Sequence, residues 1–200
     1  MKSLKKTLLL VSLSSIFYLG TSAYAAPQQY ETAVFAGGCF WSMQHDFEKT
    51  PGVVSTTVGY TGGNVVNPSY EQVSSGNTGH YEAIQIVYDP KQISYQQLVD
   101  LYWHDTDPTD ANGQFCDKGN EYHPVIFYQN AAQHQQAMAS KNNLIQSKAL
   151  TEVATQILPA KPFYPAEDYH QHYADKNPAA YSAYREGCRR DQLLRAVWGK

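Results

Sequence analysis

The sequence predicts a single α+β domain with a split βαβ (ferredoxin-like) core and an irregular C-terminal tail. Segments with the period of strands alternate with segments of helical period, in the order β-α-β-β-α-β-α-β. The chain has 200 residues, which suits one domain, and 42% of them are hydrophobic, which is enough to form a core. No internal repeat or low-complexity linker divides the chain.

The N-terminal 25 residues have the pattern of a secretory signal peptide. Three lysines precede an apolar run over residues 8–19, and a small-x-small cleavage site ends at Ala25. An uncleaved membrane anchor is the alternative, but the apolar run is short for a bilayer span. We therefore expect cleavage after Ala25, a periplasmic or secreted location, and no membrane insertion once the signal is removed. The domain is then residues 26–200, with its tail at about 175–200.

Strand and helix patterns alternate through the first half of this domain. Gly37-Gly38 breaks the first strand pattern, and Pro51-Gly52 ends the helix that follows it. In the third strand pattern Glu82 shares one side with Ile84 and Ile86. The expected elements are strands at 31–36, 53–60 and 81–88, a helix at 39–49 and a helical turn at 70–73.

The second half contains one long segment without a clear period. Ser94 with Gln97 forms a capping-box pattern that opens a helix to about His104. Residues 105–119 are rich in turn formers, and a loop of that length in a compact domain is usually functional. The remaining expected elements are strands at 124–128 and 153–158, a helix at 131–147, a loop at 159–165 and short helices in the tail.

Composition excludes several classes of protein. Only 16% of the residues are charged and the net charge is −3, which argues against nucleic acid as a partner. The three cysteines, Cys39, Cys116 and Cys188, form no CxxC pair, so neither a structural zinc site nor a disulfide-rich scaffold is expected. His104 and the aspartates near it fit no specific metal motif. We expect no metal and no cofactor.

Cys39 is the strongest candidate for a nucleophile. It lies between a strand, a Gly-Gly break and the start of a helix, where unpaired backbone N–H groups and the helix dipole favour a thiolate. A small buried core cysteine is the simpler alternative. Two aromatic residues, Phe40 and Trp41, follow at the first turn, which indicates a pocket rather than ordinary helix packing.

Several ordered blocks of the sequence resemble the A-type methionine sulfoxide reductases. The GCFW signature of that family stands at Gly38-Cys39-Phe40-Trp41, and the likeness runs from roughly residue 32 to the C-terminus. Such enzymes restore oxidised methionine. The further blocks with which the sequence resembles the family are Val58-Gly59-Tyr60-Thr61-Gly62-Gly63, Gly79-His80-Tyr81-Glu82-Ala83, Asp117-Lys118-Gly119-Asn120-Glu121-Tyr122 and Ala166-Glu167-Asp168-Tyr169-His170-Gln171.

The resemblance implies roles for these residues. Cys39 would attack the sulfur of methionine-S-sulfoxide, free or in proteins, and Glu82 would supply a proton to the oxygen, with its pKa raised by an apolar pocket. Each residue also has a simpler interpretation. Glu82 would be a solvated residue of a strand, Tyr60 and Tyr122 would be core tyrosines, and Asp117 would cap a turn. By the same resemblance Tyr60, Tyr122 and Asp117 would serve the polarised oxygen, and Phe40 and Trp41 would hold the substrate methyl group.

The resemblance also implies recycling of the oxidised nucleophile. Attack leaves Cys39 as a sulfenic acid, which a second thiol condenses to a disulfide. Ser42 stands where some family members carry that thiol, so Cys188 in the tail is our favoured partner of Cys39. Cys116 is the alternative resolving thiol, and direct reduction by an external thiol is a third route. The role of His123 is left open, because the family commonly has Arg there.

The expected function is therefore repair of oxidised exported proteins, with a thioredoxin-like partner as reductant. Two other classes stay open at this point. A cysteine hydrolase or acyltransferase would need Cys39 to be activated by a histidine such as His80. An exported binding module would use its Gly- and Tyr-rich loops to bind a peptide, without chemistry at Cys39.

Overall fold

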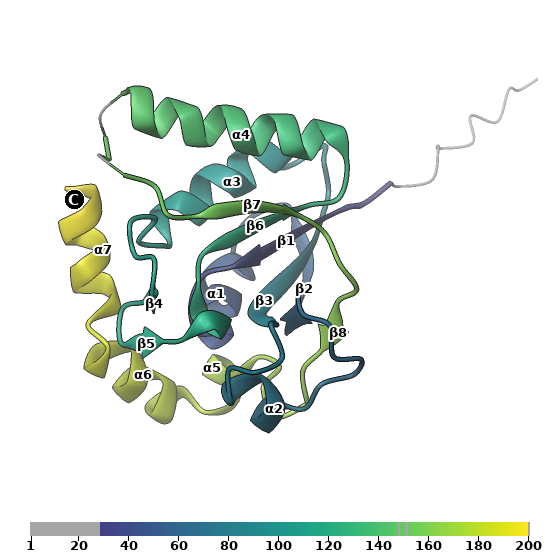
Figure 1. The fold of residues 1–200 in the computed structure, drawn as a ribbon, viewed down its shortest axis with the longest axis vertical. Helices are drawn as coiled ribbons and strands as arrows, with labels where there is room; N and C mark the ends of the chain where they lie inside the picture. The colour runs from purple at the N-terminus through teal and green to yellow at the C-terminus, as the bar shows by residue number, and fades with distance from the viewer. Residues whose placement is uncertain (1–28, 148, 151, 200) are drawn as a thin grey trace, which may run out of the picture.

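The computed structural model describes residues 29–147, 149–150 and 152–199 (Figure 1). The expected signal peptide and its cleavage after Ala25 lie outside the described residues. Within those ranges, no helix is both long and apolar enough to cross a membrane.

One six-stranded sheet forms the centre of the fold. Its strands are β1 (Glu31–Ala36), β2 (Val53–Thr61), β3 (Tyr81–Tyr88), β6 (Val125–Tyr128), β7 (Gln156–Pro159) and β8 (Tyr164–Pro165). Their spatial order is β7-β6-β1-β3-β2-β8. β3 lies between β1 and β2 and is antiparallel to both, so the predicted split βαβ core is confirmed. Only β6 and β7 are parallel among the paired strands of this sheet, because a helix crosses between them.

Three helices, α1 (Phe40–Phe47), α3 (Tyr95–His104) and α4 (Ala131–Gln146), pack on one face of the sheet. Met43 of α1, Leu98 of α3 and Ala137 of α4 belong to one buried cluster with Ile84 and Ile86 of β3. The predicted capping box opens α3, where Ser94 accepts from the backbone N–H of Gln97. This face of β3 is therefore the core side, and Glu82 belongs to it.

The segments that were expected to be loops contain short paired strands. A hairpin of β4 (Gly113–Gln114) and β5 (Asp117–Lys118), followed by the 3₁₀ turn η1 (Asn120–Tyr122), occupies part of 105–119. β8 adds two residues to the free edge of β2. Strands of two residues are too short to show a period, which is why the sequence pattern did not reveal them.

The remaining helices lie near this hairpin or close one end of the sheet (Figure 1). They are α2 (Tyr70–Ser74), α5 (Tyr173–Lys176), α6 (Pro178–Gly187) and α7 (Arg190–Trp198). The short helices expected in the tail are thus α5, α6 and α7, and Pro178 stands at the first position of α6, where a missing N–H costs nothing. Figure 1 shows α6 beside β5, far from it in sequence.

Candidate active site

Cys39 lies in the tight turn between β1 and α1. Gly38 has a φ of +83°, and a Cβ on it would stand 2.7 Å from the Cβ of Gln114. A Cβ on Gly37 would stand 2.6 Å from a methyl carbon of Thr106. The two glycines are therefore required for the backbone to pass this point, and Cys39 becomes the N-cap residue of α1.

The Cys39 thiol is buried, with 7% of the residue exposed. Burial raises its pKa well above the usual value, and the neighbouring carboxyls of Glu82 and Asp117 raise it further. Hydrogen bonds from the Trp41 backbone and the Tyr184 hydroxyl act in the opposite direction. The expected preference for a thiolate is thus not met in this form, because burial and nearby carboxyls outweigh the start of the helix.

Glu82 is buried on the helix-covered face of β3, with 3% of the residue exposed. Its Oε2 accepts the backbone N–H of Phe40 at 3.1 Å, which places the carboxyl at the start of α1. Burial raises the pKa of Glu82 to about 8, although the bond from Phe40 lowers it. The carboxyl is therefore mostly protonated at neutral pH, as a proton donor must be.

Three tyrosines, from β2, α2 and η1, lie close enough to Glu82 for its charge to raise their pKa values. Tyr60 is buried on β2, and its hydroxyl donates to Glu167 Oε2 at 2.9 Å. Burial raises the pKa of Tyr122 at the end of η1, and the charge of Glu82 is the largest electrostatic contribution after it. Burial also raises the pKa of Tyr70 to about 12, again with Glu82 contributing. Tyr70 was not expected in the site, and its only sequence signal is the capped turn that it begins.

Glu167 holds two of these tyrosines in place. Besides the Tyr60 hydroxyl, it accepts the backbone N–H of Tyr70 at 2.9 Å. Burial raises the pKa of Glu167, but these hydrogen bonds outweigh it and the net pKa is lowered. Glu167 lies within one of the blocks quoted for the family resemblance, which was the signal available for it.

Aromatic side chains make the apolar part of the site. The Phe40 ring lies 5.9 Å from that of Tyr60, and Trp41 stacks on Tyr173 with ring centroids 3.7 Å apart. Trp41 Nε1 donates to Nδ1 of His170 at 3.0 Å. His170 is 1% exposed, so it is buried within the site and is not a surface histidine. His170 fixes the orientation of the Trp41 ring.

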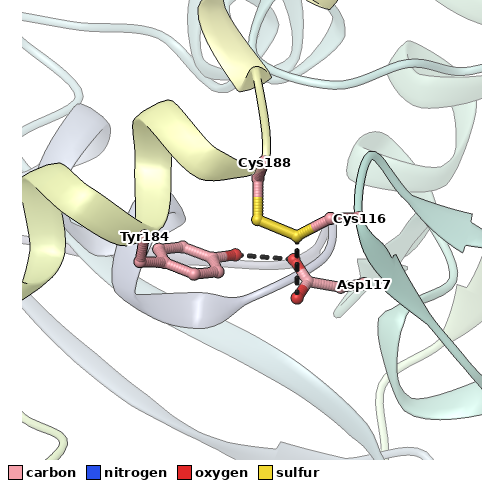
Figure 2. Close-up of a disulfide and its surroundings, with 4 residues drawn as sticks. All are labelled: Cys116, Asp117, Tyr184 and Cys188. Carbon is pink, nitrogen blue, oxygen red and sulfur yellow. Dashed lines mark hydrogen bonds between the residues drawn. A yellow bond between two sulfur atoms is a disulfide. The ribbon is translucent and has the colours of Figure 1, made fainter.

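Asp117 joins the nucleophile to the C-terminal tail (Figure 2). Its Oδ2 accepts the Tyr184 hydroxyl of α6 at 2.6 Å, and its carboxylate also accepts the backbone N–H of Cys39. Burial raises the pKa of Asp117, whereas the bond from Tyr184 lowers it. Tyr184 in turn meets Trp41 edge-on, at 5.9 Å between centroids. Tyr184 was missed because the tail gave no hint of where α6 would pack.

The cysteines are not paired as expected. Cys116 and Cys188 form a disulfide with their Cα atoms 4.9 Å apart, and Cys39 is free (Figure 2). The expected bond between Cys39 and Cys188 is absent in this form, and so is the alternative bond between Cys39 and Cys116. The end of α6 brings Cys188 to the turn between β4 and β5, a placement that the aperiodic 105–119 segment could not predict.

The structure brings together the residues that the sequence had singled out. Within the described ranges, contacts and mutual charge effects connect Cys39, Phe40, Trp41, Tyr60, Glu82, Asp117 and Tyr122.

Two other interpretations lose their support. The ring nitrogens of His80 are bonded to backbone, with Nδ1 accepting from Gly63 and Nε2 bonded to the Val65 carbonyl, so His80 is not the activating base of Cys39. The aspartates near His104, which a metal site would need as ligands, have protein partners. Asp105 lies 3.2 Å from Arg190, and Asp110 pairs with Lys118.

Comparisons with known proteins agree on one family. The model of the peptide methionine sulfoxide reductase family matches residues 31–200. "Peptide methionine sulfoxide reductase MsrA 2" of Caulobacter vibrioides is 46% identical over 197 residues, which is 97% of this chain and 99% of that protein. Methionine sulfoxide reductase A of Corynebacterium diphtheriae matches with a TM-score of 0.71 and 35% identity, over 76% of this chain and 77% of that one. Reduced Mxr1 from Saccharomyces cerevisiae matches with a TM-score of 0.72 and 33% identity, over 80% and 92%.

Proposed function

The chain belongs to the peptide methionine sulfoxide reductase family and is a peptide-methionine (S)-S-oxide reductase, and we propose that it works through Cys39, Glu82 and a Cys116–Cys188 recycling disulfide. The observation that carries this proposal is the junction of a buried thiol with a buried, protonated carboxyl at the start of one helix.

The reduction step needs a nucleophile on sulfur and a proton on oxygen. Cys39 as a thiolate attacks the sulfoxide sulfur while Glu82 gives its proton to the oxygen. The oxygen passes to the sulfur of Cys39, so methionine leaves with two more electrons and Cys39 becomes a sulfenic acid. Phe40 and Trp41 hold the methyl group of the substrate. The hydroxyl of Tyr122 stabilises the charge that develops on oxygen, and that of Tyr60 does so once it turns from Glu167 to the substrate.

The burial of Cys39 affects when its thiolate can form. The thiol is held protonated by burial, so the thiolate must form in the site itself once substrate binds. Protonation of the sulfoxide oxygen by Glu82 makes the sulfur more electrophilic. The Glu82 carboxylate that this leaves takes the proton of the neighbouring Cys39 thiol, which makes the attacking group more nucleophilic. Asp117, which already accepts the Cys39 backbone N–H, positions the nucleophile for this step.

Recycling uses both remaining cysteines in sequence. The Cys188 thiolate attacks the sulfur of the Cys39 sulfenic acid, releasing water and forming a Cys39–Cys188 bond. The Cys116 thiolate then attacks Cys188, which returns Cys39 as a thiol and leaves the Cys116–Cys188 disulfide. This order keeps Cys188 as the partner of Cys39 and makes Cys116 the thiol that completes the cycle.

A thioredoxin-like protein then reduces this disulfide, and the chain acts on oxidised exported proteins in the periplasm or outside the cell. Support for the reductant is that Cys116 is exposed and that the yeast relative Mxr1 has been solved in complex with Trx2. Support for export is the signal-peptide pattern of the first 25 residues. If the chain is exported, its thioredoxin-like reductant must lie on the same side of the membrane as the chain.

The experiment is a turnover assay with methionine-S-sulfoxide and dithiothreitol. The wild-type protein should form methionine in proportion to protein added, and Cys39→Ser should form none with any reductant, because a hydroxyl is not ionised near neutral pH. Turnover by Cys39→Ser would place the nucleophile elsewhere. A hydrolase would consume no reductant, and a binding module would form no methionine.

A further inference from the structure

We propose that the reductant attacks the sulfur of Cys116, forms a mixed disulfide there, and expels Cys188. This inference rests on the proposed function for the role of the disulfide, and it concerns which half of that disulfide the partner contacts. In the exchange, the partner's thiolate forms a new bond to Cys116 Sγ, the bond between Cys116 and Cys188 breaks, and its electron pair stays on Cys188 as a thiolate.

Access to the two sulfurs differs. Cys116 is an exposed residue in the turn between β4 and β5, whereas Cys188 is 8% exposed at the junction of α6 and α7. A thiolate must reach the sulfur that it attacks along the S–S bond, so the exposed side of this disulfide is the Cys116 side. The side chain of Tyr184 packs against the same junction from α6 (Figure 2).

Charge favours the same direction. Asp117 Oδ1 lies 3.7 Å from Cys116 Sγ, and a carboxylate at that distance disfavours a thiolate on Cys116. Cys188 is followed by Arg189 and Arg190. The guanidinium of Arg190 lies 4.7 Å from the ring centre of Phe115, the residue before Cys116, and is paired with Asp105. The carboxylate of Asp117 is therefore the charge that distinguishes the two sulfurs.

The dipoles of the two helices do not decide the direction. Cys188 caps the C-terminal end of α6 and lies just before the N-terminal end of α7, so their opposite terminal charges oppose each other at this residue. Accessibility and the Asp117 carboxylate are then the features that distinguish the two sulfurs.

The direction of attack determines what is released. With the partner bound to Cys116 on the hairpin, Cys188 is free, and so is the α6–α7 segment that the disulfide had tied to the hairpin. That segment carries Tyr184, which lies four residues before Cys188. The Tyr184 hydroxyl is bonded to Asp117 beside Cys39. Attack at Cys116 therefore releases the α6–α7 segment beside the active site in the first reduction step, before the partner has left.

The test is to trap the mixed disulfide on the full-length oxidised protein. The probe is a thioredoxin that keeps its attacking cysteine and has its resolving cysteine changed to serine. After incubation, free thiols are alkylated and the adduct is digested without reductant for mass spectrometry. We expect thioredoxin on Cys116 in at least about tenfold excess over Cys188, with Cys188 alkylated in the same molecules.

Cys39→Ala serves as the matched variant. It retains the Cys116–Cys188 bond and removes the one other thiol, so exchange with Cys39 cannot move the adduct after it forms. The same excess on Cys116 is expected. An adduct mainly on Cys188, equal adducts, or no adduct when dithiothreitol opens the bond would each overturn the inference. The assay contains no sulfoxide, so its failure is separate from failure of methionine formation in the turnover assay.

Discussion

Glu82 accepts the backbone N–H of Phe40 at 3.1 Å, which holds a buried carboxyl at the start of the helix that Cys39 caps. The proposed nucleophile and the proposed acid are thus held by adjoining elements of the split βαβ core, Cys39 in the turn between β1 and α1 and Glu82 on β3. A rigid sheet and the first turn of a helix set their relative position, which favours precise proton transfer.

Glu82→Gln should preserve the fold and slow methionine release. The amide oxygen can still accept from Phe40, but the side chain has no acidic proton to give, so we expect a loss of about 10²–10⁴-fold. The loss should fall on the first, sulfenic-acid-forming step. Single-turnover release of methionine from the fully reduced enzyme measures that step, and a normal rate would make Glu82 a structural residue.

The same carboxyl should make stability depend on pH. Burial raises the pKa of Glu82 from 4.5 to about 8, so the folded protein keeps a proton that the unfolded chain has already lost in this interval. The stability contribution is therefore fully present below about pH 4.5 and is lost as pH rises through about 8, at roughly 1.4 kcal/mol for each pKa unit.

Denaturant unfolding of wild type and Glu82→Gln across this interval isolates that contribution, because the other titrating groups are common to both proteins. The advantage of the variant over wild type should grow as pH rises. Parallel pH profiles would show that Glu82 titrates near its ordinary value.

The reaction should select the S epimer. The proposed site gives each of three substituents of the chiral sulfur its own place: the methyl group at Phe40 and Trp41, the oxygen at Glu82, and the side-chain carbon towards solvent. Exchange of methyl and oxygen in the R epimer would place the oxygen on the aromatic rings. Rates on the separated epimers of a methionine sulfoxide peptide check this, and equal rates would contradict the proposed site.

The two recycling cysteines should stall at different stages when changed. Cys116→Ser should release one methionine and stop as a Cys39–Cys188 disulfide, because the thiol that resolves it is missing. Cys188→Ser should release one methionine and stop as a Cys39 sulfenic acid, which dimedone labels. Peptide mapping distinguishes the two products. A Cys39–Cys116 bond in Cys188→Ser would mean that Cys116 is the first resolving thiol.

Much of this architecture could be predicted from the sequence, because long elements have a period. The alternation in 81–88 placed Glu82 on the same side of the strand as Ile84 and Ile86, and the structure buries that side. The Gly37-Gly38 break correctly located the turn before Cys39, where a side chain would collide with Thr106 or Gln114. These are local consequences of the pattern.

What could not be predicted depends on contacts between distant segments. The Cys116–Cys188 bond joins a short hairpin to the end of α6 over 72 residues, and neither segment has a period that places it. The positions of Tyr184 and Glu167 in the site also depend on contacts between distant segments, so they could not be predicted either. The expectation of a thiolate at Cys39 was wrong because the start of the helix can be read from the sequence, whereas the degree of burial, which dominates the pKa of the thiol, cannot.

The most direct measurement is a single turnover by the fully reduced protein with methionine-S-sulfoxide and no reductant. Methionine is counted, and the cysteines are then mapped by alkylation and mass spectrometry. With one equivalent of methionine-S-sulfoxide per chain, the account predicts one methionine per chain, with Cys39 recovered as a thiol and Cys116 joined to Cys188. No methionine, or methionine formed while Cys39 is alkylated beforehand, would contradict the claim that Cys39 is the nucleophile and that this disulfide stores its oxidation.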